Sequence, residues 1–260
     1  MDIKTFAALA TTIFFWSSAF VGIRIGLHDY SPGALALLRY LTASIAIIPV
    51  YFSLKNRVTL RSKDLFAFLI VGASGFTIYN IALNHGEVTV PAGIASFIVG
   101  LIPVFTMLLA ITFLNERVHA RGWVGVSISF LGVVLIAVGE HAGIKFDMGV
   151  LYNLIAAIAA SIYAVMQKPL LKRYPPLQVG AIAIWIGTIL LLFYTKDLYL
   201  QIKSASADAT IAAIYMGIFP GVTAYMAWSY ALSRVPACQA STAIYTMPIV
   251  TTFMAYLYLN

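Results

Sequence analysis

The chain has 260 residues, of which 62% are hydrophobic and only 10% are charged, and its mean hydropathy is +0.93. Soluble domains carry about 25% charged residues, so this composition excludes a soluble fold and predicts an all-α, polytopic membrane protein. The single cysteine, Cys238, excludes a disulfide framework and a multi-cysteine metal site.

Nine apolar blocks of bilayer length follow one another along the chain. They lie at about 5–23, 32–53, 65–84, 92–114, 122–139, 149–167, 177–194, 209–231 and 237–259. Their content of Gly, Pro, Ser and aromatic residues predicts helices packed against helices, whereas the short alternating segments of a membrane β-barrel do not occur. The first block resembles a secretory signal, but no small-residue cleavage site follows it, so we expect an uncleaved first span.

The basic residues predict the orientation of these spans. If the N-terminus is cytoplasmic, eleven basic residues lie inside: Lys4, Lys55, Arg57, Arg61, Lys63, Arg117, Arg121, Lys168, Lys172, Arg173 and Arg234. Four lie outside: Arg24, Lys145, Lys196 and Lys203. Because short cytoplasmic loops carry the excess of Lys and Arg, this orientation is the expected one. The net charge of +7 thus reflects topology and contact with lipid headgroups, and no nucleic-acid partner is expected.

Two parts of the chain repeat each other. The segment "GFTIYN" from Gly75 matches "GVTAYM" from Gly221 at an offset of 146, and Pro103 matches Pro248 at an offset of 145. A five-span unit that is repeated enters the membrane the other way up, so the sequence predicts an inverted five-plus-five repeat with units at 1–140 and 141–260. The second unit holds only four blocks, so we expect its equivalent of the fifth block to be missing from this chain.

The paired prolines indicate breaks in two helices. Each proline removes a backbone donor, which should free the carbonyl groups of Val99 and Ile244 four residues earlier. In transporters built from inverted repeats, breaks at corresponding places point to the binding site. We therefore expect Pro103 and Pro248 to act as hinges beside a cavity, the alternative being passive kinks.

Polar and aromatic side chains within the spans are expected to line that cavity. Several share one helical face, at spacings such as i, i+4 and i+7. The predicted cavity residues are Thr12, Trp16, Tyr79, Asn80, Asn84, Ser96, Gly100, Tyr163, Gln167, Tyr225, Trp228, Ser229, Ser241 and Tyr245. Aromatic walls with few hydrogen-bonding groups suit a small, partly apolar metabolite such as an amino acid better than an inorganic ion. The alternative for each residue is contact between helices or an aromatic belt at the membrane surface.

Ionisable groups are scarce within the blocks. Arg39 is the one that lies clearly inside a block, where it either faces the protein interior or extends to the membrane surface. All nine carboxylates and all four histidines are expected at span ends or in loops. This pattern predicts no catalytic residue, no cofactor and no metal site, and it leaves no carboxylate at membrane depth to carry protons. We therefore expect facilitated, gradient-driven movement, with His85 as the one group that could still titrate near neutral pH.

The segments "IPVFTMLLAITFLNE" and "MPIVTTFMAYLYLN", together with "LLRY" in the second block, resemble the EamA family of the drug/metabolite transporter superfamily. The resemblance covers essentially the whole chain. It implies ten helices with both termini cytoplasmic, a central cavity, and alternating access. It also implies transport, often export, of amino acids or other small metabolites across the bacterial inner membrane. Glu116 matches the acidic residue that ends the family's fourth helix, where a structural role is implied.

Other features of the sequence bear on partners and on competing functions. Gly125, Gly132 and Gly139 form a small-residue face in the fifth block, which permits close helix packing and a homodimer. The first block has no acidic residue, unlike the four-helix multidrug branch of the superfamily, which argues against proton-coupled efflux of cations. A membrane scaffold without transport activity is the main alternative function, and an enzyme is the third.

Overall fold

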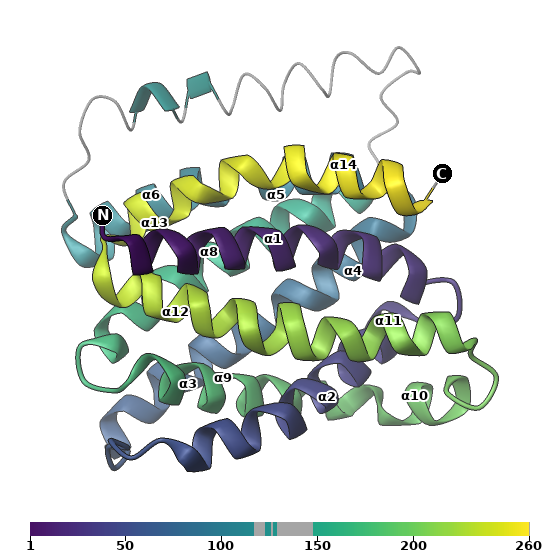
Figure 1. The fold of residues 1–260 in the computed structure, drawn as a ribbon, viewed down its shortest axis with the longest axis horizontal. Coiled ribbons are helices and arrows are strands. Elements are labelled where there is room, and N and C mark those ends of the chain that lie inside the picture. Colours follow the sequence, from purple (N-terminus) through teal and green to yellow (C-terminus); the bar gives the residue numbers. More distant parts are fainter. Residues whose placement is uncertain (117–122, 126, 129–147, 260) are drawn as a thin grey trace.

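The computed structural model describes residues 1–116, 123–125, 127–128 and 148–259 (Figure 1). The described part of the chain is helical and contains no β-strand, which confirms the all-α prediction. Within it, seven helices are long and apolar enough to cross a membrane. The predicted fifth block, including Gly132 and Gly139, lies almost entirely outside the described residues.

In the first half, two continuous helices are followed by two interrupted ones. They are α1 (Ile3–Gly26) and α2 (Pro32–Ser53), then η1 (Ser62–Asp64), α3 (Leu65–Gly72), η2 (Ala73–Ile78) and α4 (Tyr79–Thr89), and then α5 (Ala92–Val99) and α6 (Ile102–Leu114). Figure 1 shows α1 beside α14 and α12, so that helices far apart in the sequence form one bundle.

The second half also ends in two interrupted crossings, and its second crossing contains a 3₁₀ turn as well. It comprises α8 (Met148–Leu171), then α9 (Pro176–Leu191), η3 (Leu192–Tyr194) and α10 (Thr195–Gln201), then α11 (Ala207–Ile218), η4 (Phe219–Ala224) and α12 (Tyr225–Arg234), and last α13 (Ala237–Ser241), η5 (Thr242–Thr246) and α14 (Met247–Leu259). The segment 237–259 reads as one block in the sequence, yet a 3₁₀ turn interrupts it in the structure.

Local sequence explains where several helices start and stop. Asp2, Ser31 and Ser206 accept hydrogen bonds from the backbone N–H groups three residues later, and so cap α1, α2 and α11. Val90 and Val235 end α4 and α12 in extended conformations, and each precedes a proline, which disfavours the helical region for the residue before it. The third crossing thus ends in the same way in both halves, with an extended residue followed by a proline.

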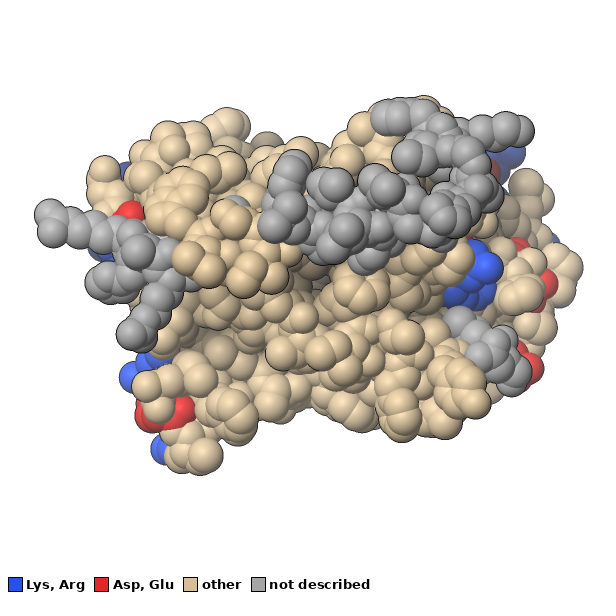
Figure 2. All heavy atoms as spheres, turned by 90° about the horizontal axis from the view of Figure 1, so that it is seen from above, with Lys and Arg blue, Asp and Glu red and all other residues tan. Residues whose placement is uncertain are grey.

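Exposed charge gathers at the two ends of the bundle on the face that Figure 2 shows. Figure 2 shows Lys, Arg, Asp and Glu toward both ends of the long axis, with a band of uncharged residues between them on this face. We call the end that carries Met1 the amino-terminal end and the opposite one the far end. At the amino-terminal end Asp64 is buried, and it pairs with Arg173 and accepts a hydrogen bond from the hydroxyl of Tyr174. An uncharged band between charged ends suits a protein that spans a bilayer, because the band faces the hydrocarbon core and the charged ends face the headgroups and water.

The repeated motif of the sequence forms the same unusual backbone in both halves. The segments η2 and η4 are π-helices, and they contain Gly75 and Gly221 at the equivalent place. A π-helical turn widens a helix and is frequent at functional sites. Each π-helix leads directly into a helix whose first residue is a tyrosine, Tyr79 or Tyr225.

Candidate substrate pocket

A small pocket lies inside the bundle, between the two halves. Its lining consists of Trp16, Gly75, Tyr79, Ile102, Ala160, Tyr163, Tyr225, Trp228, Ile244 and Met247. Five of these residues belong to the predicted cavity set: Trp16, Tyr79, Tyr163, Tyr225 and Trp228. The space has room for little more than a water molecule, so the pocket is closed in this structure.

Equivalent positions of the two halves meet in this pocket. Tyr79 and Tyr225 follow the two π-helices, and Ile102 and Met247 are the first residues of α6 and α14. Trp16 on α1 corresponds to Ala160 on α8 at an offset of 144. Matching positions of the two sequence repeats therefore line one pocket, and the Trp16–Ala160 pair makes its lining asymmetric.

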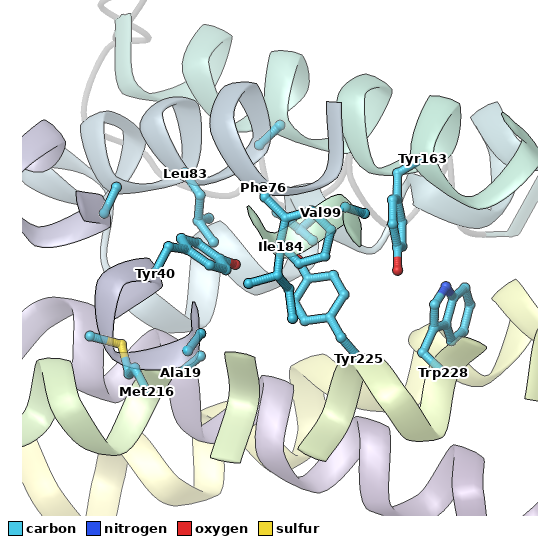
Figure 3. Packing of buried hydrophobic residues seen from close by; sticks show 14 of the residues in the cluster. Ala19, Tyr40, Phe76, Leu83, Val99, Tyr163, Ile184, Met216, Tyr225 and Trp228 are labelled. Carbon is cyan, nitrogen blue, oxygen red and sulfur yellow. The ribbon is translucent and has the colours of Figure 1, made fainter. Parts of the chain in front are cut away.

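Aromatic rings pack directly against each other around the pocket. The ring of Trp16 lies 5.1 Å from that of Tyr225 and 5.2 Å from that of Trp228. Tyr163 packs against Tyr225 edge to face at 5.6 Å, and Phe76 contacts both tyrosines (Figure 3). Rings at these separations attract one another and leave flat apolar walls.

Hydrogen-bonding atoms with no protein partner lie in these walls. The indole N–H groups of Trp16 and Trp228 and the hydroxyl of Tyr163 are buried and have no hydrogen-bond partner among the described residues. Figure 3 shows the Tyr163 hydroxyl directed toward Trp228. A buried polar group without a hydrogen-bond partner lowers the stability of a protein. A ligand could supply partners here, with acceptors for the two indole N–H groups and a donor for the Tyr163 hydroxyl.

Gly75 allows the close packing of this wall. A Cβ atom at Gly75 would overlap the ring of Tyr163, so only glycine fits here. The carbonyl of Gly75 accepts a hydrogen bond from the Tyr225 hydroxyl at 3.0 Å, which links the first half to the second.

Several predicted cavity residues instead serve contacts within and between helices. The hydroxyl groups of Thr12, Ser96 and Ser241 donate to backbone carbonyls of their own helices, and Thr12 also contacts the carbonyl of Ala224. The Asn84 amide donates to the carbonyl of Pro32 at the far end. These residues, together with Gly100 and Tyr245, do not line the pocket as the structure describes it.

Gln167 and Ser229 form a buried pair beside the aromatic wall. The Ser229 hydroxyl bonds the Gln167 carbonyl oxygen at 3.1 Å. The amide nitrogen of Gln167 has no hydrogen-bond partner in the described part of the chain. Neither residue lines the pocket in this conformation.

Both prolines lie next to real breaks in their helices. Pro103 is the second residue of α6, after the interruption at Gly100–Leu101, and Pro248 is the second residue of α14, after the 3₁₀ turn η5. Serines from the opposite half donate to the carbonyls just before the prolines: Ser161 to Ile102 at 3.0 Å and Ser17 to Met247 at 3.4 Å. At each break, a side chain from the other half therefore supplies a hydrogen bond to the backbone.

Arg39 faces the protein interior, so it does not extend to the membrane surface. Its side chain is buried and donates through Nη1 to the carbonyl oxygen of Asn80 at 3.0 Å. The Asn80 amide nitrogen donates in turn to the Tyr40 hydroxyl and to the carbonyl of Phe76, both at 2.9 Å. Asn80 thus belongs to a polar network behind the pocket wall.

Glu87 lies at the end of the third span, as expected for the carboxylates, but its burial was not predicted. The helix α4 continues past the apolar block to Thr89, and Glu87 is 0% exposed. The segment "NHGE" looks polar in the sequence, yet the packing of α1, α2 and α8 against α4 covers it. A buried acid therefore does exist within the helical bundle.

Sequence reasoning also missed the other five residues of the lining, which are Gly75 and the apolar Ile102, Ala160, Ile244 and Met247. Apolar residues within an apolar span carry no signal of their own. The internal offset could have found two of them, because Ile102 and Met247 immediately precede the paired prolines.

Glu116 joins the two halves at the amino-terminal end. Its carboxylate accepts from the backbone N–H groups of Ala237 at 2.9 Å and Cys238 at 3.1 Å, and so caps α13. This contact is a structural one, since a carboxylate stabilises the positive end of a helix.

Comparisons with known proteins agree with this architecture. The model of the EamA-like transporter family matches residues 4–138 and 147–260. A "Probable terminal-alkyne amino-acid exporter" of Streptantibioticus cattleyicolor is 35% identical over 258 residues, which cover 99% of this chain and 86% of that protein. The uncharacterized transporter YdfC of Bacillus subtilis is 38% identical over 246 residues, covering 94% and 80%.

A solved crystal structure has the same fold. It is 17% identical, covers 99% of this chain and 88% of that one, and superimposes with a TM-score of 0.73. The apolar helices, the charged ends and the family match together describe a multi-pass membrane transporter. This chain belongs to the EamA-like transporter family.

Proposed function

We propose that the protein exports a small amino acid or a related metabolite across the bacterial inner membrane by alternating access, with its N-terminus in the cytoplasm. The observation that carries this proposal is the aromatic pocket between the inverted halves, with its unpartnered indole and phenol groups. The similarity to a protein named as an amino-acid exporter supports the substrate class.

The chemistry of the pocket favours a zwitterionic or neutral solute with an apolar part. Two indole N–H donors, at Trp16 and Trp228, could bind a carboxylate or carbonyl oxygen. The Tyr163 hydroxyl and the aromatic faces could receive an ammonium group, since a cation over an aromatic ring is attracted by the ring's quadrupole. No charged side chain belongs to the lining that the structure describes, so a strongly charged ion would lack a counter-charge there.

The closed state must open toward each side in turn. Space for one water molecule cannot hold an amino acid, so binding requires the two halves to separate at the aromatic wall. The helix breaks beside Pro103 and Pro248 are the places where α5–α6 and α13–α14 can bend without breaking further backbone hydrogen bonds.

The test is counterflow of radiolabelled amino acids into liposomes that contain the purified full chain. The wild type should accumulate at least one apolar or aromatic amino acid. Trp228→Phe should reduce the rate, because it removes the N–H donor and leaves a smaller aromatic ring in place of the indole. The matched control is Trp185→Phe, because Trp185 donates its N–H to the carbonyl of Ser44 away from the pocket. Equal rates in Trp228→Phe and wild type would count against binding at this pocket.

The competing function is that of a membrane scaffold. A scaffold needs no polar group inside the bundle, so it would tolerate Trp228→Phe and would show no counterflow of any tested amino acid. The unpartnered donors in the pocket favour the transporter.

A further inference from the structure

A group of buried hydrogen-bond donors lies on one side of the aromatic pocket. The side chain of Gln167 is 0% exposed, and its amide nitrogen has no hydrogen-bond partner among the residues that the structure describes. The indole N–H of Trp228 and the hydroxyl of Tyr163 are likewise buried and unpartnered there. Buried polar groups are normally hydrogen-bonded, so several unpartnered ones side by side need an explanation other than packing.

Helical spacing brings these groups together. Tyr163 and Gln167 are four residues apart on α8, so their side chains are neighbours on one face of that helix. Trp228 and Ser229 are adjacent on α12, and the Ser229 hydroxyl donates to the Gln167 carbonyl oxygen at 3.1 Å. That bond uses the oxygen of the amide and leaves its nitrogen, with two N–H groups, as the free end of the side chain.

Gln167 and Ser229 lie on the amino-terminal side of the pocket. The helices α8 and α12 both end at the amino-terminal end of the bundle, where Lys168 donates to the carbonyl of Leu232. Ser229 lies one turn beyond the pocket residue Tyr225 in this direction. Neither Gln167 nor Ser229 lines the closed pocket, so an opening toward the amino-terminal end would add the Gln167 amide to the wall.

The two repeats can be compared position by position across α1 and α8. At the offset of 144, Ser17 matches Ser161, and each donates to the carbonyl just before the proline of the other half. Arg24 matches Lys168, and both donate to a backbone carbonyl in the last turn of a neighbouring helix. Contacts as well as sequence therefore support this alignment.

The first half fills the matching positions with apolar side chains. The positions that match Tyr163, Gln167, Trp228 and Ser229 hold, in that order, Ala19, Ile23, Ala82 and Leu83, all of them buried. The last two are counted from the tyrosine that begins α4 or α12. Figure 3 shows Tyr163 and Trp228 on one side of the cluster and Ala19 and Leu83 on the other. Packing in this fold therefore does not require polar groups at these positions.

We propose that Gln167 is the residue that recognises a carboxylate group of the transported solute. When the pocket opens toward the amino-terminal end, the Gln167 amide nitrogen and the Trp228 indole N–H donate to the carboxylate oxygens. The apolar part of the solute then lies toward the far side of the pocket. Ser229 is a positioning residue, because its bond to the Gln167 oxygen fixes which end of the amide is free.

This inference rests on the proposed export function for the role of the pocket, and it adds a requirement for the substrate, which is a free carboxylate. An amino acid meets the requirement, whereas the amino alcohol with the same side chain does not. Hydrogen bonds to an ionised acceptor are about twice as strong as neutral ones, so neutral N–H donors can distinguish the two ligands without a cationic side chain.

The experiment measures binding at equilibrium, so it does not require transport. The purified full chain in detergent is titrated with L-leucine and L-phenylalanine, and with L-leucinol and L-phenylalaninol, which keep the side chain and the ammonium group but lack the carboxylate. Each dissociation constant follows from the rise of the unfolding temperature with ligand concentration. In the wild type, at least one acid should bind about tenfold or more tightly than its alcohol, as expected for a hydrogen bond to a charged group.

Variants at Gln167 identify the donor. Gln167→Met keeps the length of the side chain and removes both N–H groups, so it should weaken binding of the acid about tenfold and leave binding of the alcohol unchanged. Gln167→Ile copies the first half and keeps the test possible if the methionine variant does not fold. The matched control is Gln239→Met, which removes an exposed amide on α13 and should follow the wild type.

Three results would overturn the proposal: no preference for the acid in the wild type, an unchanged preference in the Gln167 variants, or an equal loss of acid and alcohol binding, which would indicate a structural role. The export function can fail separately. Counterflow of amino acids without a preference for the acid would refute the carboxylate site and leave export standing. A preference for the acid without counterflow would support the site and refute export.

Discussion

The hydroxyl of Tyr225 donates a hydrogen bond to the backbone carbonyl of Gly75 over 3.0 Å, and so fastens the π-helix of the first half to the first turn of α12. Tyr79 is the equivalent of Tyr225, but it makes no such bond to Gly221 among the described residues. The two halves therefore differ at the pocket, since in the described part of the chain only the tyrosine of the second half bonds the glycine of the other half.

Removal of this hydroxyl should favour the open states. We expect Tyr225→Phe to lower the free energy of unfolding by about 0.5–1.5 kcal/mol, the net contribution of a typical hydrogen bond. The measurement is thermal unfolding in detergent together with maleimide reactivity of a cysteine at Ala160. Tyr79→Phe is the matched control, and equal stability and reactivity of the two variants would show that the Tyr225 bond does not hold the pocket closed.

Substitution of the two prolines should act on opposite gates. In Pro103→Ala and Pro248→Ala the missing backbone donor returns, which favours a straight helix through each break. Because the halves are inverted, one variant should hinder opening at the far end and the other opening at the amino-terminal end.

Transport rate and side-specific reactivity of Tyr245→Cys, on a background that lacks Cys238, measure this effect. A shift of about 1.4 kcal/mol changes a population ratio tenfold, so a modest straightening should be visible. Wild-type rates and unchanged reactivity in both variants would reduce the prolines to passive kinks.

The orientation predicts which loops are accessible from each side of the membrane. Cysteines at Ser62 and Ser204 lie at the amino-terminal and far ends of the bundle, respectively. In intact cells an impermeant thiol reagent should label Ser204→Cys, whereas Ser62→Cys should react only after the membrane is opened. Labelling of both from outside would contradict the cytoplasmic N-terminus.

A pH-dependent contact joins two loops at the far end. Asp29 accepts hydrogen bonds from the Ser206 hydroxyl and backbone N–H, and these bonds hold the pKa of the exposed carboxyl below its ordinary value. A group with a lowered folded-state pKa contributes stability above its unfolded pKa, and this contribution disappears as the pH falls through the lowered value.

Amide hydrogen exchange in residues 202–206 should therefore be slower in the wild type than in Asp29→Asn at neutral pH. The difference should vanish in acid, once Asp29 is protonated. An equal difference at every pH would mean that the contact does not depend on the charge of Asp29.

Much of the architecture could be predicted because it repeats within the sequence. The match of "GFTIYN" with "GVTAYM" located the two π-helices, and the paired prolines located both helix breaks. The aromatic residues of the pocket were found because large polar-tipped rings are unusual at the centre of a span. The π-helical conformation itself was not predicted, since it depends on how the two halves pack.

The rest of the site depends on contacts that the sequence does not display. The hydroxyl groups of Thr12 and Ser96 donate hydrogen bonds to backbone carbonyls of their own helices. A position on the inner face of a helix therefore does not by itself make such a residue part of a pocket. The burial of Glu87 was not predicted because hydropathy describes a residue's transfer to lipid, whereas α1, α2 and α8 supply the surroundings of this residue. Whether a polar side chain is buried depends on which helices pack around it, and the local sequence does not show this.

The serine contacts at the helix breaks constrain how the protein is made. Ser161 on α8 donates to the carbonyl of Ile102, and Ser17 on α1 donates to that of Met247, so each half completes the broken helix of the other. During synthesis the first four crossings enter the bilayer before α8 exists, with the break beside Pro103 still lacking its serine. We therefore expect the first half to reach its final packing only after the second half has been inserted.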